Sequence, residues 1–208
     1  MLDYENELYK EGKTLIAGVD EVGRGPLIGP VVACAVILPV NFFHKDIKDS
    51  KKLSEKKREE LYTIIKENAV SIGLGIVSEK VIDEVNIYEA TKIAMKEAIS
   101  NLEVKPEHVL IDAMKLDIDI PTTSIIKGDA LSETIAAASI VAKVTRDHLL
   151  VKMDEEYPMY DLKNNKGYGT KKHIEALEKY GASKYHRKTF NPVTKVLNRW
   201  KSFEIFVK

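Results

Sequence analysis

Residues 14–38 read TLIAGVDEVGRGPLIGPVVACAVIL, and this stretch decides the fold. Its two ends, residues 14–19 and 31–38, are short apolar runs of the kind that form buried strands. Glycine and proline recur in the segment between them and favour a turn there. The stretch therefore predicts two neighbouring strands joined as a hairpin, with the acidic pair Asp20 and Glu21 at the end of the first strand.

Strands and helices alternate along the rest of the chain. The third expected strand, residues 69–77, alternates Val, Ile and Leu with Ser71, Gly73 and Gly75. This alternation predicts that the apolar side chains form the buried face, while the glycines leave the opposite face open to close approach. The other expected elements are a helix capped by Ser54, helical pieces over 79–101, strands over 108–111 and 123–127, a long helix over 130–156 that Pro158 ends, and a short helix over 171–180 between Thr170 and Gly181.

This order of elements predicts an α/β protein. Five strands interleaved with helices are typical of a layered domain in which helices pack on a mixed sheet. The chain has 208 residues, which suits one domain with a small C-terminal elaboration. Hydrophobic residues make up 44% and charged residues 31%, so the composition excludes a disordered class.

Three compositional features bear on location and partners. No stretch reaches the ~18 uninterrupted apolar residues of a membrane-spanning helix, so we expect a cytoplasmic protein with no membrane partner. The single cysteine, Cys34, lies in an apolar run and is expected to be a core residue without a disulfide. The net charge is zero, but residues 163–208 hold twelve Lys and Arg against three acids. This stretch is either a surface for nucleic-acid phosphates or a solvated basic tail.

Four acidic residues stand at the ends of expected strands: Asp20 and Glu21 after the first, Asp112 after the fourth and Asp129 after the fifth. Ligands in α/β proteins gather at the carboxyl ends of strands. If the first and fourth strands are parallel neighbours, these acids crowd together and need a cation to balance their repulsion. Oxygen ligands without His or Cys suit Mg²⁺ or Mn²⁺, and a pair of such ions can cleave a phosphodiester. Each acid taken alone could instead form a turn or cap a helix, as Asp129 could.

The motif DEVGRGPLIGP at residues 20–30 resembles the opening block of ribonuclease HII, and further blocks agree in the order of that family. Those blocks are DSKKLS at 49–54, LID at 110–112, KGD at 127–129, AAASIVAKVTRD at 136–147, NKGYGT at 165–170 and HRKTFNPV at 186–193. The resemblance covers residues from about 14 to 193. It implies a ribonuclease H-like fold with a C-terminal helical extension. It also implies two divalent ions, Mg²⁺ or Mn²⁺, held by the catalytic acids Asp20, Glu21, Asp112 and Asp129.

The same resemblance implies an activity and a substrate. The enzyme would cut RNA/DNA hybrids, and duplex DNA with an embedded ribonucleotide, on the 5′ side of the ribonucleotide, leaving 3′-hydroxyl and 5′-phosphate ends. Such an enzyme would serve ribonucleotide excision repair and DNA replication. We expect a catalytic domain over residues 1–160 and a basic C-terminal helical extension over 161–208 that contributes to substrate binding. We also expect a monomer, and whether the C-terminal tail binds a replication partner is left open.

A glycine-rich loop and a tyrosine are implied in recognition of the ribose. The resemblance assigns Gly23, Arg24 and Gly25 to the 2′-hydroxyl and the adjacent phosphate, and Tyr168 to the sugar on the other side. Glycines suit this role because they let the main chain approach the sugar closely. The alternative for Tyr168 is a loop aromatic that folds back onto the core.

Basic residues are the candidates for contacts with backbone phosphates. They are Lys51, Lys143, Arg146 and the basic residues of 163–188. Lys143 and Arg146 are three residues apart on the expected long helix, which puts them at neighbouring surface positions. The alternative for both is an ordinary solvated charge on a helix.

Three other classes of protein stay open. Ribonuclease HIII has a similar acidic site, but it usually carries an N-terminal substrate-binding domain, for which a first strand near residue 14 leaves no room, and it lacks the Gly-Arg-Gly triplet. Another metal-dependent nuclease or transferase of the same fold would need the acids but not Tyr168. A non-catalytic nucleic-acid-binding module would need the basic stretch but not the acids.

Overall fold

The computed structural model describes residues 1–48 and 53–206, of which residues 201–206 are described through their backbone alone. The helices and strands within them are α1 (Asp3–Lys10), β1 (Ile16–Val22), β2 (Val31–Ile37), α2 (Glu55–Asn68), β3 (Ser71–Val77), α3 (Glu79–Val85), α4 (Ile87–Ser100), β4 (His108–Asp112), β5 (Thr122–Ile125), α5 (Gly128–Leu131), α6 (Glu133–Glu156), η2 (Pro158–Tyr160), α7 (Leu162–Asn165), α8 (Lys171–Tyr180) and α9 (Val193–Phe206).

The chain folds into two compact units, and each of them is built from several segments. The first unit consists of Met1–Val22, Val32–Ile76 and Thr91–Thr145. The second unit consists of Gly23–Val31, Val77–Ala90 and Arg146–Lys208. The functional division at residue 160 stays a prediction.

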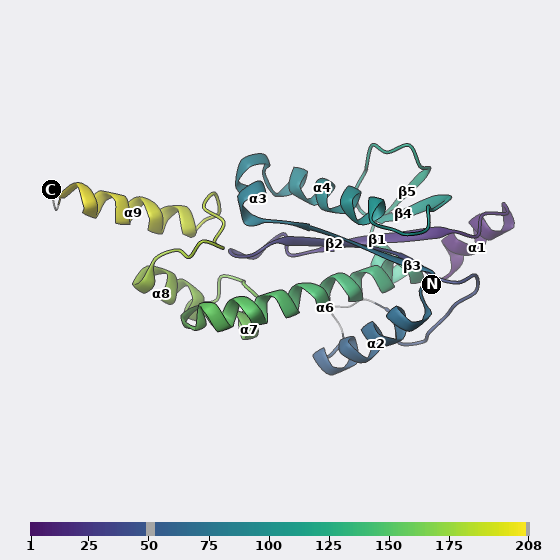
Figure 1. Ribbon diagram of the computed structural model, residues 1–208, viewed down its shortest axis with the longest axis horizontal. Coiled ribbons are helices and arrows are strands. Elements are labelled where there is room, and N and C mark those ends of the chain that lie inside the picture. Colours follow the sequence, from purple (N-terminus) through teal and green to yellow (C-terminus); the bar gives the residue numbers. More distant parts are fainter. Residues whose placement is uncertain (49–52, 207–208) are drawn as a thin grey trace. The chain divides into compact units, whose positions relative to one another are not determined.

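The first unit contains a sheet whose five described strands are ordered β3-β2-β1-β4-β5 (Figure 1). β1 pairs with β2 in antiparallel orientation, which confirms the predicted hairpin. β1 also pairs with β4, and β4 with β5, in parallel orientation. The sheet is therefore mixed, as predicted, and β1 and β4 end at the same edge.

Helices cover both faces of this sheet, with α4 on one face and α6 on the other (Figure 1). Glycines in the strands make room for both helices. A Cβ atom on Gly18 of β1 would overlap the backbone of Thr134 in α6, and one on Gly75 of β3 would overlap the carbonyl oxygen of Ala94 in α4. The predicted close approach at the glycines of β3 is thereby confirmed.

The predicted buried face of β3 is wrong. Ser71, Gly73 and Gly75 are buried, whereas Ile76 on the apolar face is 46% exposed. Gly73 and Gly75 face inward because the backbone of α4 packs directly against them. The alternation in the sequence therefore predicted the strand correctly but not the side that faces the helix.

The long helix predicted over residues 130–156 is also divided, into α5 and α6. Ser132 is extended between them, with φ −123° and ψ 130°. Its Oγ accepts a hydrogen bond from the N–H of Ile135 and donates one to Oε1 of Glu5, a buried residue of α1. Ser132 thus begins α6 as an N-terminal cap.

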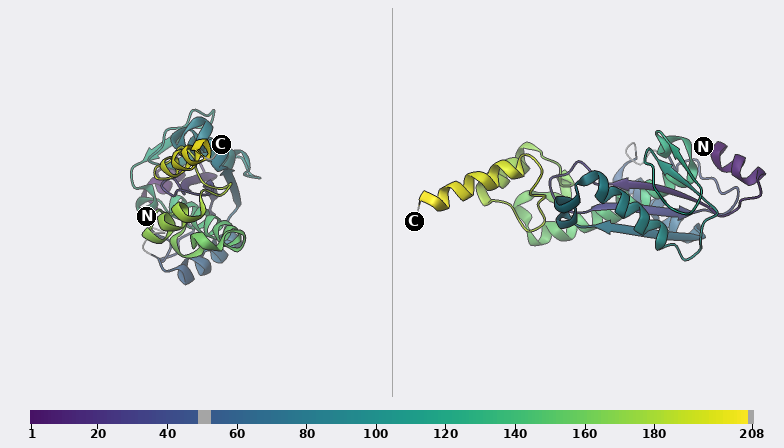
Figure 2. Two further views of the ribbon diagram at one scale, coloured as in Figure 1. Left: turned by 90° about the vertical axis from the view of Figure 1, so that its left-hand side faces the viewer. Right: turned by 90° about the horizontal axis from the view of Figure 1, so that it is seen from above.

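α1 is part of the core of the first unit. It lies near β4 and β5 in Figure 2, where it is coloured purple and the two strands are teal. Leu8 of α1 packs in one cluster with Ile16, Leu110, Ile125 and Ile135. Cys34 of β2 is fully buried in the same unit, as predicted for a core residue.

The second unit contains η2, α7, α8 and α9 together with the loop of residues 23–30. Thr170 caps α8 by accepting a hydrogen bond from the N–H of His173, and Gly181 ends this helix, both as predicted. Leu27 of the loop packs with Leu177 of α8 and with Val193 and Val196 of α9, which lies in the predicted C-terminal helical extension. In the described part of the chain, no helix combines the length and apolar character needed to traverse a bilayer.

Candidate active site

Asp20 and Asp112 lie at one edge of the sheet because each ends one of two parallel strands. In the β1–β4 pair, Val19 lies opposite Ile111, so Asp20 and Asp112 come next in the register. Glu21 follows Asp20 within β1. Three of the four carboxylates predicted to converge, those of Asp20, Glu21 and Asp112, are therefore brought together at this edge.

Asp20 is a buried carboxylate among like charges. The residue is only 4% exposed, and burial raises its pKa well above the usual range. The neighbouring charges of Glu21 and Asp112 raise this pKa further. Hydrogen bonds from Ser139 and from the N–H of Glu21, which lies 2.7 Å from Oδ1, act in the opposite direction without cancelling the rise. A cation beside Asp20 would offset both the burial and the repulsion.

The Lys-Gly-Asp segment brings the backbone of Asp129 beside this cluster. Lys127 has a left-handed backbone, with φ 59°, and this turns the chain from β5 into α5. The N–H of Gly128 then donates to Oδ1 of Asp112 at 2.7 Å. Asp129 is the next residue and is buried. The part that its carboxylate plays in the site stays a prediction.

These acids do not form a closed cage for a metal ion. Within residues 1–48 and 53–206, no group of three or more Asp, Glu, His or Cys side chains is arranged so that it could hold one. Mg²⁺ does not require such a cage, since it is usually bound by one or two carboxylates together with waters and substrate phosphates. The carboxylate oxygens and their mutual repulsion at Asp20 fit a divalent cation of that kind.

The residues predicted to recognise the ribose belong to the second unit. Gly23 has φ +94°, which other residues rarely adopt, and Arg24 after it is exposed. A Cβ atom on Gly25 would lie 3.3 Å from Cε1 of Tyr168, so the tyrosine ring lies directly beside this glycine. Tyr168 is 51% exposed, which excludes an aromatic folded back onto the core. The fold thus places Gly25 and Tyr168 side by side, although they are distant in the sequence.

The predicted surface position of Arg146 is wrong. The residue is 1% exposed, and its guanidinium donates hydrogen bonds to the carbonyls of Ile28, Pro30 and Lys166. Its donors are therefore used within the second unit. Arg146 supports the loop of residues 23–30 and is not placed to contact a phosphate.

Lys143 and Lys51 are two lysines predicted to contact phosphate. Lys143, in the part of α6 that belongs to the first unit, is partly buried, and its phosphate contact stays a prediction. Lys51 lies outside the described residues. In the basic stretch of 163–208, the side chains of Lys171 and Lys172 are 91% and 70% exposed, so positive charge is at the surface at the start of α8.

Arg187 was predicted only as one of the basic residues of 163–188 that contact phosphates, and this surface role is wrong for it. It is fully buried, and its guanidinium donates to carbonyls of the loop of residues 23–30. The residue lies in the HRKTFNPV block, which matched the family pattern, and this match was the available signal. The sequence could not show that the partners are backbone carbonyls far away along the chain.

His173 and His186 form a chain of hydrogen bonds that ends on Tyr168. The N–H of Ser183 donates to Nδ1 of His186 at 2.9 Å, so the proton of a neutral His186 is on Nε2. This Nε2 lies 3.1 Å from Nε2 of His173, whose own proton is then on Nδ1, 2.9 Å from the carbonyl oxygen of Tyr168. Burial lowers the pKa of both histidines, that of His186 to about 3, so both are neutral. The chain of hydrogen bonds holds the backbone of Tyr168 in place.

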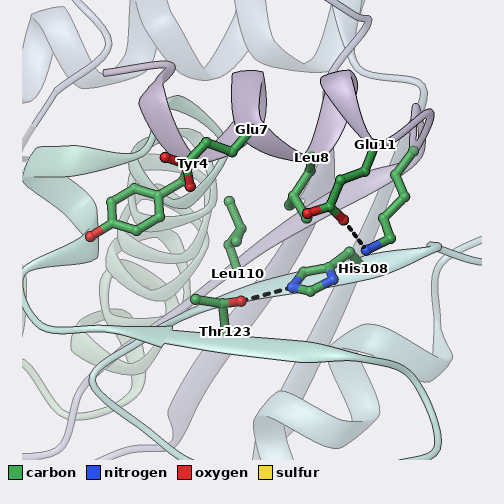
Figure 3. A pocket seen from close by; sticks show the side chains of 8 residues that line it. Tyr4, Glu7, Leu8, Glu11, His108, Leu110 and Thr123 are labelled. Carbon is green, nitrogen blue, oxygen red and sulfur yellow. Dashed lines mark hydrogen bonds and ion pairs between the residues drawn. The ribbon is translucent and has the colours of Figure 1, made fainter.

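A separate hollow of about 320 Å³ lies in the first unit, between α1 and the start of β4 (Figure 3). In it, Nε2 of His108 lies 2.8 Å from Oγ1 of Thr123, and Glu11 forms an ion pair with Lys13 at 2.7 Å. β4 runs from His108 to Asp112, so the hollow is at the opposite end of this strand from the acidic cluster. It contains none of the predicted site residues and is not part of the candidate active site.

Comparisons with known proteins agree with this geometry. The family model described as ribonuclease HII matches residues 17–193. The ribonuclease H2 of Pyrococcus horikoshii OT3 is similar with a TM-score of 0.77 and 27% identity, over 89% of this chain and 98% of that one. The PCNA:RNase HII complex of Archaeoglobus fulgidus gives a TM-score of 0.71 at 27% identity, over 85% and 95% of the two chains. Bst-RNase HIII in complex with Mn²⁺ gives 0.71 at 17% identity, over 91% and 71%, and shares the fold.

Proposed function

The chain belongs to the ribonuclease HII family and is a ribonuclease H, a hydrolase, and we propose that it cuts on the 5′ side of a ribonucleotide in RNA/DNA hybrids and in duplex DNA. The products would carry 3′-hydroxyl and 5′-phosphate ends. The observation that carries the proposal is the meeting of three carboxylates where two parallel strands end, in which burial and the charges of Glu21 and Asp112 raise the pKa of Asp20. A repulsive cluster of this kind is the arrangement expected where divalent ions bind.

Divalent ions are the cofactor of this proposal. Members of the ribonuclease H family generally use divalent metals, and the Bst-RNase HIII structure contains Mn²⁺. Asp20, Glu21, Asp112 and Asp129 would hold two ions, Mg²⁺ or Mn²⁺. When bound, such ions lower the pKa of water and stabilise the negative charge that develops on the cleaved phosphate. Ser139 and the N–H of Gly128 would keep Asp20 and Asp112 oriented toward them.

Recognition of the ribonucleotide would fall to the loop of residues 23–30 and to Tyr168. The distinguishing group is the 2′-hydroxyl, which is both a donor and an acceptor. Gly23 and Gly25 let the main chain approach that hydroxyl, and the Tyr168 ring beside Gly25 supplies a flat apolar surface for the sugar of the next nucleotide. Arg24 and Lys143 would contact phosphates.

Several wider assignments belong to the same proposal. Residues 1–160 would form the catalytic domain, and the basic extension of residues 161–208 would bind the substrate backbone. We propose a cytoplasmic monomer that acts in ribonucleotide excision repair and DNA replication. The Archaeoglobus fulgidus relative is known in a complex with PCNA, and a replication partner for the tail of this chain is a proposal on that basis.

The test is cleavage of an end-labelled duplex with a single embedded ribonucleotide. With Mg²⁺ or Mn²⁺ we expect one cut, 5′ to the ribonucleotide, and with a chelator we expect none. The same duplex without the ribonucleotide should stay intact. No cleavage with either ion, or cleavage at deoxyribonucleotides as well, would contradict the proposal.

A further inference from the structure

Arg187 holds the backbone of the loop of residues 23–30, which we call the recognition loop. Its Nε donates to the carbonyl of Gly29 at 3.0 Å. Its two terminal nitrogens donate at 2.5–2.9 Å to the carbonyls of Gly23, Arg24 and Pro26. One planar guanidinium therefore sets the orientation of four peptide groups of the recognition loop.

Arg146 holds further carbonyls in the same unit. Its Nε donates to Pro30 at 3.0 Å, and its terminal nitrogens donate to Ile28 at 3.1 Å and to Lys166 at 3.0 Å. Lys166 stands two residues before Tyr168. Arg146 therefore ties the recognition loop to the segment that carries the tyrosine.

The burial of both arginines has an electrostatic cost. It lowers the pKa of Arg146 to about 10 and that of Arg187 to about 9, and the charge of Arg146 adds to the effect on Arg187. Asp147 offsets part of this cost for Arg146, as Glu79 and Asp83 do for Arg187. Burying two cations to hold one loop is expensive, which indicates that the geometry of this loop matters.

Because the peptide bond is planar, a carbonyl that is held by an arginine also fixes the direction of the N–H of the next residue. In a trans peptide, the carbonyl and the following N–H point in opposite directions. The recognition loop shows this at Pro26, whose carbonyl faces the guanidinium while the N–H of Leu27 donates away from it to the carbonyl of Gly167 at 2.9 Å. By the same rule, the held carbonyl of Arg24 makes the N–H of Gly25 point away from the guanidinium.

We propose that Arg187 and Arg146 are positioning residues for ribonucleotide discrimination. Arg187 fixes the direction of the Gly25 N–H, and Arg146 ties the recognition loop to the segment that carries Tyr168. An N–H held in this direction can donate to the oxygen of a 2′-hydroxyl, and a deoxyribose offers no acceptor at that position. The inference rests on the proposed function and adds to it the groups that make the loop selective.

The test measures discrimination in the full-length chain. Asp20→Asn is introduced to stop cleavage, and fluorescence anisotropy gives the affinity for a duplex with one ribonucleotide and for the same duplex in DNA alone, with Mg²⁺ present. Arg187→Lys keeps the charge but cannot reproduce the planar set of donors. We expect the ribonucleotide-to-DNA affinity ratio to fall about tenfold, the effect of one lost hydrogen bond. The affinity for plain DNA should change by less than about twofold, since phosphate contacts supply it.

Arg58→Lys is the matched control, because the guanidinium of Arg58 also donates to a carbonyl, that of Leu53, which is outside the recognition loop. Thermal unfolding shows whether each variant is folded at the temperature of the measurement. If Arg187→Lys is not, Arg146→Lys is measured in the same way. It loses the hydrogen bonds that tie Ile28 and Pro30 of the recognition loop to Lys166, and its affinity ratio should also fall.

A folded variant with an unchanged affinity ratio would overturn the inference, and so would an equal loss of affinity for both duplexes. Failure of the proposed function gives a different result, because the unaltered chain would then neither cleave nor prefer the ribonucleotide duplex. The two failures are therefore distinguishable.

Discussion

The acidic edge of the sheet, where Asp20, Glu21 and Asp112 meet, and the recognition loop are both polar regions with buried groups. The charges and dipoles of these buried groups are compensated in different ways. At the acidic edge, Asp20 is buried beside two other carboxylates, and its pKa rises. In the recognition loop, the carbonyls of Gly23, Arg24, Pro26, Ile28, Gly29 and Pro30 all accept hydrogen bonds from two arginines. One region holds charges that repel one another, and the other holds peptide groups in fixed directions.

This difference corresponds to the two tasks of the proposed reaction. The proposed cleavage of a phosphodiester uses divalent ions, and crowded carboxylates attract such ions. Selection of a ribonucleotide needs donors that do not move, because a flexible loop would adapt to either sugar. The crowded carboxylates thus lower the stability of the fold at the acidic edge, whereas the two arginines make the recognition loop rigid.

The largest expected effect comes from breaking the repulsion at the acidic edge. Asp20→Asn should reduce cleavage at least about a thousandfold, on the order of 4 kcal/mol in the activation free energy, because a ligand of the ions is lost. Binding of the duplex should survive, since phosphate contacts remain. The same substitution removes a buried charge and should raise the free energy of unfolding by roughly 1–2 kcal/mol in metal-free buffer.

Single-turnover cleavage, anisotropy and urea unfolding measure these three quantities. Asp117→Asn is the control, because Asp117 is an exposed acid of the same unit, and it should change none of them. Undiminished turnover in Asp20→Asn would remove the acidic edge from the mechanism.

The second-largest loss of cleavage is expected when the aromatic ring beside the recognition loop is removed. Tyr168→Ala should lower cleavage at a lone ribonucleotide roughly 10–100-fold, because the sugar loses its packing surface beside Gly25. Binding to plain DNA should stay within about twofold. Tyr88→Ala is a suitable control, since Tyr88 is 47% exposed and Tyr168 is 51% exposed. Equal losses in cleavage and in plain DNA binding would mean that Tyr168 has only a folding role.

A smaller effect should follow when the chain of hydrogen bonds that holds the backbone of Tyr168 is broken. In His186→Asn the side chain can still accept from the N–H of Ser183, but it no longer reaches His173. Cleavage should fall about three- to tenfold as the carbonyl of Tyr168 loses its fixed partner. His186→Gln places an amide N–H where Nε2 was and should recover most of the rate in the same assay. A Gln variant as slow as the Asn variant would contradict the proposed chain of hydrogen bonds.

The fold could be predicted from the sequence where the cause is local. The hairpin follows from two apolar runs around a Gly/Pro turn, and a carboxylate that directly follows a strand must lie at the edge of the sheet. The inward face of β3 could not be predicted in this way. Its glycines face inward because a helix backbone packs on them, and that partner is distant in the sequence.

The site was predictable in part for the same reason. Asp20, Glu21 and Asp112 meet because strand pairing brings strand ends together, and this could be reasoned from pattern alone. The side chains of Arg146 and Arg187 end on carbonyls of a loop far away along the chain. A long basic side chain can lie on the surface or bury its head among acceptors, and only the tertiary fold decides between them.

Glu133 limits the comparison, because it is a buried acid that belongs to neither region. Burial and the nearby charge of Glu5 raise its pKa to about 7, from an ordinary value of 4.5. The folded state therefore holds this proton more tightly than the unfolded chain does. The resulting contribution to stability is present below about pH 4.5 and is lost as the pH rises through about 7.

Glu133→Gln should abolish this dependence while keeping the acceptor for the N–H of His44. We expect the variant to be more stable than the unaltered chain by roughly 1–3 kcal/mol near pH 8, and no more stable near pH 4, in urea unfolding. Cleavage at a single ribonucleotide should stay within about twofold. If cleavage instead collapsed as in Asp20→Asn, the loss of any buried acid with a raised pKa would be enough to impair the enzyme, and the position of Asp20 at the end of β1 would lose its special meaning. Unchanged cleavage would show that the repulsion matters only where two parallel strands end together.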